Sequence, residues 1–291
     1  MILVTHNDLD GVGCEIVFRY FEPTLQESQI NHCHYGNVDL TVRELLEKTN
    51  DHLVITDISI SEETAHYIAD CHSHRVELFD HHKTAQSYLQ KYSWAFVDLE
   101  RSATKIIFDT LQARHANQPI APDLERLVFH INDYDLWRHT SPDSRLFNDL
   151  LSLLGKELFA RLMLQRIREN ASLISEVDDF YLQGLDKTKQ RYFAERTKKA
   201  LVIGNRLVLI ASRYNSDLSQ YIRNIDPSPS EWEQVDYIDI LNFESGTHTL
   251  RSYKPGFDVS TVAMQNGGGG HPSASGCPMK HFPDLAYLSQ L

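Results

Sequence analysis

The first half of the chain alternates short apolar runs with longer segments in which apolar residues recur every three or four positions. Short apolar runs are typical of buried strands, and the longer period is typical of amphipathic helices. Strands are expected at residues 2–5, 53–56 and 76–79, and helices at 12–21, 62–71 and 103–114. Ser61 and Ser102 stand where the N-caps of two of these helices belong. Strands that alternate with helices predict a parallel sheet with helices on both faces, and we place this α/β domain at residues 1–154.

The hydrophobic pattern changes in the second half. Residues 155–199 carry apolar side chains at helical spacing throughout and predict a helical connector. From residue 200 onward, strand patterns dominate. Strands are expected at 200–203, 206–211, 235–242 and 248–252, with helices near 217–224 and 258–265. We therefore predict a smaller mixed α/β domain over residues 200–291.

Composition indicates an ordinary globular protein. Hydrophobic residues make up 42% and charged residues 23% of the chain, and no apolar run approaches the roughly 20 residues that cross a bilayer. The four cysteines are scattered and form no Cys-x-x-Cys pair, which suits free thiols in a reducing compartment. We expect a cytoplasmic protein with no membrane partner.

Negative charge is concentrated in the first half. Residues 1–150 contain 24 acidic and 12 basic residues, while the remainder is balanced. An acidic domain repels a long phosphate backbone, so long duplex nucleic acid is not an expected partner. Most of these carboxylates suit a solvated surface, but a subset could form a cluster that divalent cations neutralise.

Each predicted strand of the first half ends in side chains that can bind a metal. These donors are His6, Asp8 and Asp10 after the first strand, Asp57 after the second, and Asp80, His81 and His82 after the third. A single aspartate at such a position is usually a helix cap or a turn residue. Parallel topology, however, brings the three strand ends to one edge of the sheet, where the carboxylates would repel one another without cations.

Oxygen and imidazole donors without sulfur suit manganese, magnesium or iron. Two such ions about 3.5–4 Å apart can activate a water and stabilise charge on a phosphoryl group. Asp133 or Asp135, in a loop expected after a helix at residues 124–131, would add another carboxylate. The residues themselves leave both open.

A run of four glycines at residues 267–270 precedes His271. Such a run is either a flexible linker or a nest of exposed backbone N–H groups that binds an anion. Arg251 adds a guanidinium suited to phosphate. The residues expected to bind substrate are Arg251, Gly268, Gly269, Gly270 and His271.

Taken in order, these motifs resemble those of the DHH phosphoesterase family over nearly the whole chain. The matching segments are His6-x-Asp8-x-Asp10-Gly11, the isolated Asp57, the triplet Asp80-His81-His82, the later Asp133, and the glycine-rich end with His271. The last resembles the DHH-associated C-terminal domain. Within the family, the chain is most similar to NrnB-type oligoribonucleases.

The resemblance implies two manganese ions, with magnesium as the alternative. The implied ligands are His6, Asp8 and Asp57 for one ion, and Asp10, Asp57, His81 and Asp133 for the other, with Asp57 shared. His82 is implied to face the scissile phosphate and Asp80 to orient a ligating imidazole. Two departures stand out: many relatives place the first histidine four residues before the first aspartate, and Asp-Tyr-Asp replaces the usual Asp-Thr-Gly, so Asp135 rivals Asp133.

The implied activity is hydrolysis of short single-stranded RNA or a dinucleotide to nucleoside 5′-monophosphates. Alternatives within the family are a 3′-phosphoadenosine 5′-phosphate phosphatase, a linear or cyclic dinucleotide phosphodiesterase, and a single-strand DNA exonuclease. An inactive nucleotide sensor is the alternative outside enzymes. A homodimer is a further expectation, because relatives with this second domain often pair.

Overall fold

The computed structural model describes residues 1–279. Its contacts divide the chain into two compact units, the first of which runs from Met1 to Leu182. The division falls inside one long helix, α9 (Glu176–Thr197). The expected domain limits at residues 154 and 200 stay a prediction. Among the described residues, no helix combines the length and apolarity needed to cross a membrane.

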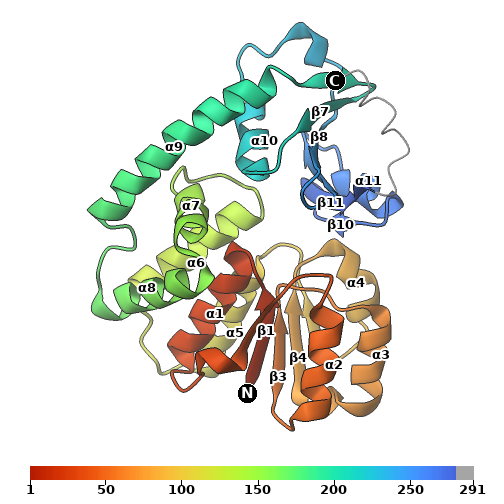
Figure 1. Cartoon of the computed structure of the whole chain (residues 1–291). Helices are drawn as coiled ribbons and strands as arrows, with labels where there is room; N and C mark the ends of the chain where they lie inside the picture. The colour runs from red at the N-terminus through yellow and green to blue at the C-terminus, as the bar shows by residue number, and fades with distance from the viewer. Residues whose placement is uncertain (280–291) are drawn as a thin grey trace. The chain divides into compact units, whose positions relative to one another are not determined.

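The first unit alternates strands and helices along the chain (Figure 1). Its strands are β1 (Ile2–His6), β2 (Ile30–Cys33), β3 (Leu53–Thr56), β4 (Val76–Asp80) and β5 (Ala95–Val97). Its helices are α1 (Leu9–Phe21), α2 (Val38–Lys48), α3 (Glu62–Cys71), α4 (Lys83–Leu89), α5 (Ala103–Arg114), α6 (Pro122–Asp135), α7 (Ser144–Leu154) and α8 (Lys156–Glu169), followed by the first part of α9. Short 3-10 turns lie at Glu27–Gln29 and Ser73–Arg75.

The sheet of this unit is parallel, with strand order β2-β1-β3-β4-β5. The chain runs from β1 outward to β2 and then returns to place β3 on the other side of β1. The direction of winding therefore reverses between β1 and β3, and ligands of open α/β sheets bind at the carboxyl ends of strands where this happens. His6 and Asp57 stand at these two strand ends.

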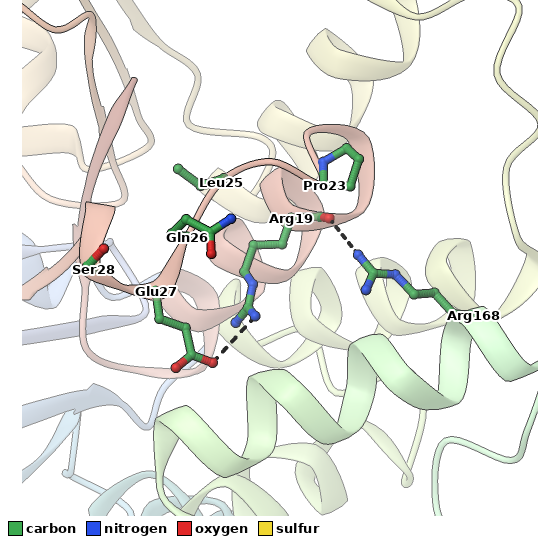
Figure 2. A pocket seen from close by; sticks show the side chains of 7 residues that line it. All are labelled: Arg19, Pro23, Leu25, Gln26, Glu27, Ser28 and Arg168. Atoms are coloured by element: carbon green, nitrogen blue, oxygen red, sulfur yellow. Dashed lines mark hydrogen bonds and ion pairs between the residues drawn. The ribbon is translucent and has the colours of Figure 1, made fainter.

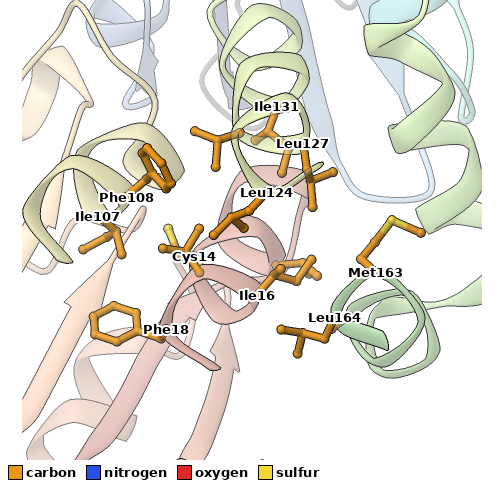
Figure 3. Packing of buried hydrophobic residues seen from close by; sticks show 14 of the residues in the cluster. Cys14, Ile16, Phe18, Ile107, Phe108, Leu124, Leu127, Ile131, Met163 and Leu164 are labelled. Carbon is orange, nitrogen blue, oxygen red and sulfur yellow. The ribbon is translucent and has the colours of Figure 1, made fainter. Parts of the chain in front are cut away.

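Alternate residues of the strands face two separate cores. Leu3 of β1 belongs to a core with residues of α1, α5, α6 and α8. Figure 3 shows part of this core, including Ile16 of α1, Ile131 of α6 and Met163 of α8. Ile2 and Val4 face the other side, where α2, α3 and α4 cover the sheet. The period-2 alternation of a strand thus buries both faces, and the predicted parallel sheet with helices on both faces is confirmed. The Ser61 and Ser102 side chains cap α3 and α5 as expected.

One expectation for the middle of the chain is wrong. Residues 155–199 are not helical throughout, because Asn170 adopts a left-handed conformation with φ of 52° and ends α8. Asparagine tolerates this conformation at a helix terminus. Asp178 then accepts hydrogen bonds from the Ser175 backbone and hydroxyl, and the next helix starts there. The helix α8 packs on α1 within the large core of the first unit.

The second unit, from Gln183 onward, contains a mixed sheet with strand order β10-β11-β9-β8-β7-β6. Among its described strands, β7 and β8 pair in parallel and the other neighbours pair antiparallel. Its strands are β6 (Leu201–Ile203), β7 (Arg206–Ile210), β8 (Tyr237–Asn242), β9 (Thr247–Ser252), β10 (Gly269–Gly270) and β11 (Ala274–Pro278). Its helices are α10 (Asn215–Arg223), α11 (Val259–Gln265) and the 3-10 turn Ser230–Trp232. The helices α9 and α10 cover one face, and α11 packs against β9 and β11. The predicted mixed α/β character is confirmed.

Candidate metal centre

The first strand and the helix that follows it place His6 and Asp8 side by side. Asp8 is the N-cap of α1 and accepts a hydrogen bond from the Gly11 backbone N–H at 3.0 Å. Its other oxygen, Oδ2, lies 2.8 Å from His6 Nδ1. The local chemistry of a helix start therefore holds an imidazole against a carboxylate at the end of β1.

Gly11 is required by this arrangement. A β-carbon at this position would lie 2.2 Å from the His6 carbonyl oxygen, far inside any allowed contact. The first turn of α1 passes so close to the end of β1 that only glycine fits. The glycine of the opening motif is thus a packing residue that keeps His6 and Asp8 in place.

Asp57 occupies the middle of the site. It is a non-glycine residue with φ of 57°, a conformation that aspartate tolerates but that costs backbone energy and is concentrated at functional sites. Its side chain is buried, with Oδ1 3.0 Å from His81 Nε2 and Oδ2 3.8 Å from His6 Nδ1. Asp57 therefore lies between the donors of β1 and those of β4.

Asp10 is fixed by a second helix start. Its two carboxylate oxygens accept hydrogen bonds from the backbone N–H groups of Ala103 and Thr104, at 2.7 and 2.9 Å, in the first turn of α5. Oδ2 also lies 3.4 Å from His81 Nε2. The two backbone N–H groups at the start of α5 therefore hold this carboxylate in a single orientation.

Asp80 and His82 form a hydrogen-bonded pair at the end of β4. Asp80 is fully buried, and its Oδ1 lies 2.7 Å from His82 Nδ1 while Ser59 Oγ donates to Oδ2 at 2.6 Å. Burial alone would raise the pKa of Asp80, but the charge and the hydrogen bond of His82 lower it. The carboxylate therefore holds the proton of His82 on Nδ1, and Nε2 points to the opposite side of the ring. Ser59 was not among the residues singled out from the sequence, since a loop serine carries no distinguishing signal.

Of the two rival aspartates, Asp135 lies with the metal donors. Its Oδ2 is 3.5 Å from His81 Nδ1. Asp133 instead accepts hydrogen bonds from the Thr140 backbone and hydroxyl, the Ser141 backbone and the Ser144 hydroxyl. The expectation that Asp133 completes the cluster does not fit this arrangement, because its oxygens anchor residues 140–144. Both aspartates also belong to the last turn of α6 and not to a loop after it.

The charges of the cluster indicate that it suits cations. Burial and the charges of Asp8 and Asp10 raise the pKa of Asp57 well above its usual range. Burial and the charge of Asp10 do the same to the pKa of Asp135. The Oδ2 atoms of Asp57 and Asp135 are buried and accept no hydrogen bond from the described residues. Carboxylates with raised pKa values and unsatisfied buried oxygens are what a divalent cation would neutralise.

Ligand atoms come within 4.8 Å of one another in three groups of the first unit. These groups are His6, Asp8 and Asp57; Asp10, His81 and Asp135; and Asp57, Asp80 and His82. The donors are carboxylate oxygens and imidazole nitrogens, which suit a hard or borderline divalent ion. The residues present therefore fit divalent cations, and Asp57 belongs to two of the three groups.

A cavity of about 350 Å³ lies elsewhere in the first unit, near the end of α1 (Figure 2). It is lined by Arg19, Pro23, Leu25, Gln26, Glu27, Ser28 and Arg168. Arg19 is 2.9 Å from Glu15 and 3.4 Å from Glu27, and Arg168 donates to the Arg19 carbonyl oxygen. The cavity contains none of the expected ligands, and Arg19 is paired with Glu15 and with the lining residue Glu27.

In the second unit, the glycine run is ordered and only partly open. Gly267 and Gly268 donate their N–H groups to the Met264 and Ala263 carbonyl oxygens at the end of α11. Gly269 and Gly270 form β10 and pair with β11. The expected nest of open N–H groups is therefore wrong for Gly267 and Gly268, because these groups terminate a helix, as glycine commonly does.

Arg251 and His271 lie on neighbouring segments of the second unit. Arg251 is on β9 opposite Ala274 of β11, and His271 is in the turn between β10 and β11. The guanidinium of Arg251 donates to Ser216 Oγ at 2.8 Å and to the Leu250 carbonyl oxygen at 3.0 Å. These bonds hold the guanidinium against the first turn of α10. The substrate-binding roles of these residues stay predictions.

Comparison with known proteins identifies the family. No family model matches the chain. It is 31% identical over 299 residues to the oligoribonuclease NrnB of Bacillus subtilis, an alignment that covers 94% of this chain and 72% of that protein. The chain belongs to the DHH phosphoesterase family. The expected enzyme class, a phosphoesterase, is thereby confirmed, as is the likeness to NrnB.

Two further comparisons agree with this membership. A 3′,5′-cyclic-nucleotide phosphodiesterase of Helicobacter pylori is 28% identical over 151 residues, which are 46% of this chain and 42% of that protein. The solved structure of PggH, a pGpG-specific phosphodiesterase from Vibrio cholerae, has a TM-score of 0.55 and 14% identity, and the match covers 99% of this chain and 96% of that one. The structural likeness confirms the DHH fold.

Proposed function

We propose that this DHH protein hydrolyses short oligoribonucleotides to nucleoside 5′-monophosphates with the help of two manganese ions. The observation that supports this most is the convergence of buried carboxylates and imidazoles around Asp57, two of them with strongly raised pKa values. The likeness to an oligoribonuclease over 94% of the chain supports the substrate class. Magnesium is the alternative metal.

The first unit supplies the ligands in this proposal. His6, Asp8 and Asp57 would hold one ion, and Asp10, Asp57, His81 and Asp135 the other. Asp135 takes the position first assigned to Asp133. Two bound ions would supply an activated water and stabilise charge on the attacked phosphoryl group. Asp57 would be shared, which accounts for its central place and its strained backbone.

The remaining residues of the site act without binding metal. His82, whose Nδ1 proton is held by Asp80, would present Nε2 to the phosphate and stabilise charge or protonate the leaving oxygen. Asp80 and Ser59 would keep this ring in one orientation. In the second unit, Arg251 and His271 would bind the distal phosphate or the terminal nucleotide, with Gly268, Gly269 and Gly270 shaping the hairpin beside them.

Short substrates suit the distribution of charge. The acidic half would repel a long phosphate backbone, whereas a few nucleotides can be held by contacts to one phosphate and one or two bases. The decisive experiment measures turnover of di- to pentaribonucleotides with manganese, with magnesium, and with a chelator. Manganese-dependent release of nucleoside 5′-monophosphates is expected, and inactivity on every length would refute the proposal.

A second candidate is hydrolysis of a linear or cyclic dinucleotide. The partial likeness to a cyclic-nucleotide phosphodiesterase and the fold shared with PggH favour this candidate over the remaining alternatives. The same assay should therefore include linear and cyclic dinucleotides, 3′-phosphoadenosine 5′-phosphate and single-stranded DNA. Nucleotide binding that survives His81→Ala without any turnover in the wild type would instead indicate a sensor. The cytoplasmic location and the homodimer stay predictions.

A further inference from the structure

Tyr35 is an exposed aromatic residue at the edge of the metal-binding cluster. It follows β2, the strand that pairs with β1, and its side chain is 53% exposed. Its ring centroid lies 5.6 Å from that of His6 and 6.0 Å from that of His82. The plane of the tyrosine is perpendicular to that of His82, at 89°. One aromatic ring therefore stands next to a proposed metal ligand and next to the residue proposed to act on the phosphate.

The backbone beneath Tyr35 is held by a compact turn. His34 donates its N–H to Asn37 Oδ1 at 2.8 Å, and Asn37 returns a hydrogen bond from its N–H to the His34 carbonyl oxygen at 3.0 Å. Gly36 donates to His34 Nδ1 at 3.0 Å. These bonds fix the turn on both sides of the tyrosine. Because this backbone is already fixed, little backbone entropy is lost when a ligand contacts the ring of Tyr35.

Single exposed apolar residues are common and need no explanation by themselves. Tyr35 differs because of what it touches. Its ring contacts the two site histidines, and half of its surface remains open to solvent beside them. A ring placed this way contributes little to the core. It offers a flat apolar face beside His6, a proposed metal ligand, and His82, which is proposed to face the scissile phosphate.

The acidic character of the first unit makes such a face useful. Carboxylates around the site repel phosphate until cations neutralise them, so the unit gains little affinity from long-range charge. Stacking of a base on an aromatic ring requires no positive charge and tolerates any base, because every base has a π-face. Single-stranded RNA is commonly bound in this way.

We propose that Tyr35 is a stacking platform for the base of a nucleotide adjoining the scissile phosphate. This inference rests on the proposed function, and it places the stacking platform at the site proposed for hydrolysis. It gives the enzyme a preference for nucleotides over phosphodiesters that lack a base, without selecting the identity of the base. The aromatic ring carries the role, and the phenolic hydroxyl lies near the cluster, where burial and the charges of Asp80 and Asp57 raise its pKa well above the usual range.

Kinetics on matched substrates test the platform. The substrates are a diribonucleotide and two analogues, one abasic at the 5′ position and the other abasic at the 3′ position. For Tyr35→Ala, kcat/KM on the intact dinucleotide is expected to fall about tenfold, the usual order for one lost base stack, whereas one abasic analogue is cleaved as well as by the wild type. Tyr35→Phe should keep the wild-type ratio of kcat/KM between intact and abasic substrates, and Phe180→Ala, at another exposed aromatic position, is the matched control.

The outcomes separate the platform from the proposed function. Equal losses on intact and abasic substrates would show that Tyr35 only maintains the fold, and an unchanged Tyr35→Ala would also overturn the inference. If the wild type cleaves no oligoribonucleotide, the proposed function fails. The platform is then decided by binding of dinucleotides containing 2-aminopurine and an uncleavable methylphosphonate linkage. Fluorescence quenching by the wild type and Tyr35→Phe, lost in Tyr35→Ala, supports stacking, and quenching that is absent from the wild type or retained in Tyr35→Ala refutes it.

Discussion

Asp133 and Asp135 stand two positions apart in the last turn of α6, yet their carboxylates have different partners. Two residues along an α-helix correspond to a rotation of about 200°, so the side chains leave the helix on opposite sides. Asp133 is surrounded by hydroxyl and backbone donors from Thr140, Ser141 and Ser144. Asp135 faces His81.

This difference predicts opposite phenotypes for two matched substitutions. Asp135→Asn is expected to lower activity at least about 100-fold and to weaken metal binding, with little change in thermal stability. Asp133→Asn removes the charge that organises residues 140–144 and is expected to lower the free energy of unfolding by about 2–3 kcal/mol. Calorimetric metal titration and thermal denaturation measure the two effects. If Asp133→Asn loses metal binding while Asp135→Asn keeps it, Asp133 is the metal ligand and Asp135 is not.

The raised pKa of Asp57 predicts how metal-free stability changes with pH. An aspartate in the unfolded chain titrates near 3.9, whereas Asp57 in the folded, metal-free protein holds its proton to higher pH. Over that range the folded state binds more protons than the unfolded state, so this residue's stabilising contribution is lost as pH rises through the raised pKa.

Asp57→Asn is therefore expected to melt above the wild type in the presence of a chelator, by a margin that grows with pH. Manganese competes with the same proton, so the metal-induced increase in Tm of the wild type should also grow with pH. Differential scanning fluorimetry between pH 5 and 8 measures both trends. If the Tm difference between Asp57→Asn and the wild type shrinks as pH rises, burial and the neighbouring carboxylates do not raise the pKa of Asp57.

Two glycines form a matched pair for testing the close packing at the end of β1. Gly11→Ala would force a β-carbon against the His6 carbonyl oxygen, and it is expected to lower stability by about 1–3 kcal/mol and to weaken metal binding by displacing His6. Gly184 lies in α9, where an added methyl group would meet none of the described neighbours within 4 Å, so Gly184→Ala should raise stability by about 0.5–1 kcal/mol. Urea denaturation distinguishes the two, and a neutral Gly11→Ala would exclude the steric argument.

Ser59 is expected to position His82 through Asp80. Removing the hydroxyl in Ser59→Ala leaves one oxygen of a buried carboxylate without its donor, at a cost of about 1 kcal/mol. We expect kcat to fall about fivefold while KM and metal stoichiometry stay unchanged, with activity restored in Ser59→Thr. A change confined to KM would place Ser59 in substrate binding instead.

The parts of the site that follow directly from strand ends were predictable from the sequence. The runs before His6, Asp57 and Asp80 are apolar and short, and parallel pairing alone brings their ends to one edge. The caps at Ser61 and Ser102 are equally local, since a serine hydroxyl needs only the next turn of backbone to bond. These features depend on nearest neighbours along the chain or across one strand pair.

The choice between Asp133 and Asp135 was not predictable, because it depends on how residues after α6 return toward it. Trp137 and His139 both adopt positive φ, at 55° and 51°, and redirect the chain so that Thr140 reaches Asp133. The hydrophobic periodicity of the sequence does not predict such a turn.

The glycine run misled for a related reason. Glycine has the greatest freedom in isolation, but a β-carbon on Gly268 would lie 2.0 Å from the Gly276 carbonyl oxygen. The following strand, β11, therefore removes the conformational freedom that the glycine run suggests. The requirement for glycine here comes from close packing of the backbone.

Asp10 accepts hydrogen bonds from the first turn of α5 with both carboxylate oxygens, and one of them, Oδ2, also lies 3.4 Å from His81 Nε2 in the metal-binding cluster. An alanine at this position would strip a ligand and uncap a buried helix in one step, so a dead Asp10 variant would reveal nothing about chemistry unless its folding were measured as well. The stability of the first turn of α5 is therefore coupled to what occupies the cluster, and amide exchange at Ala103 and Thr104 should report whether metal is bound there.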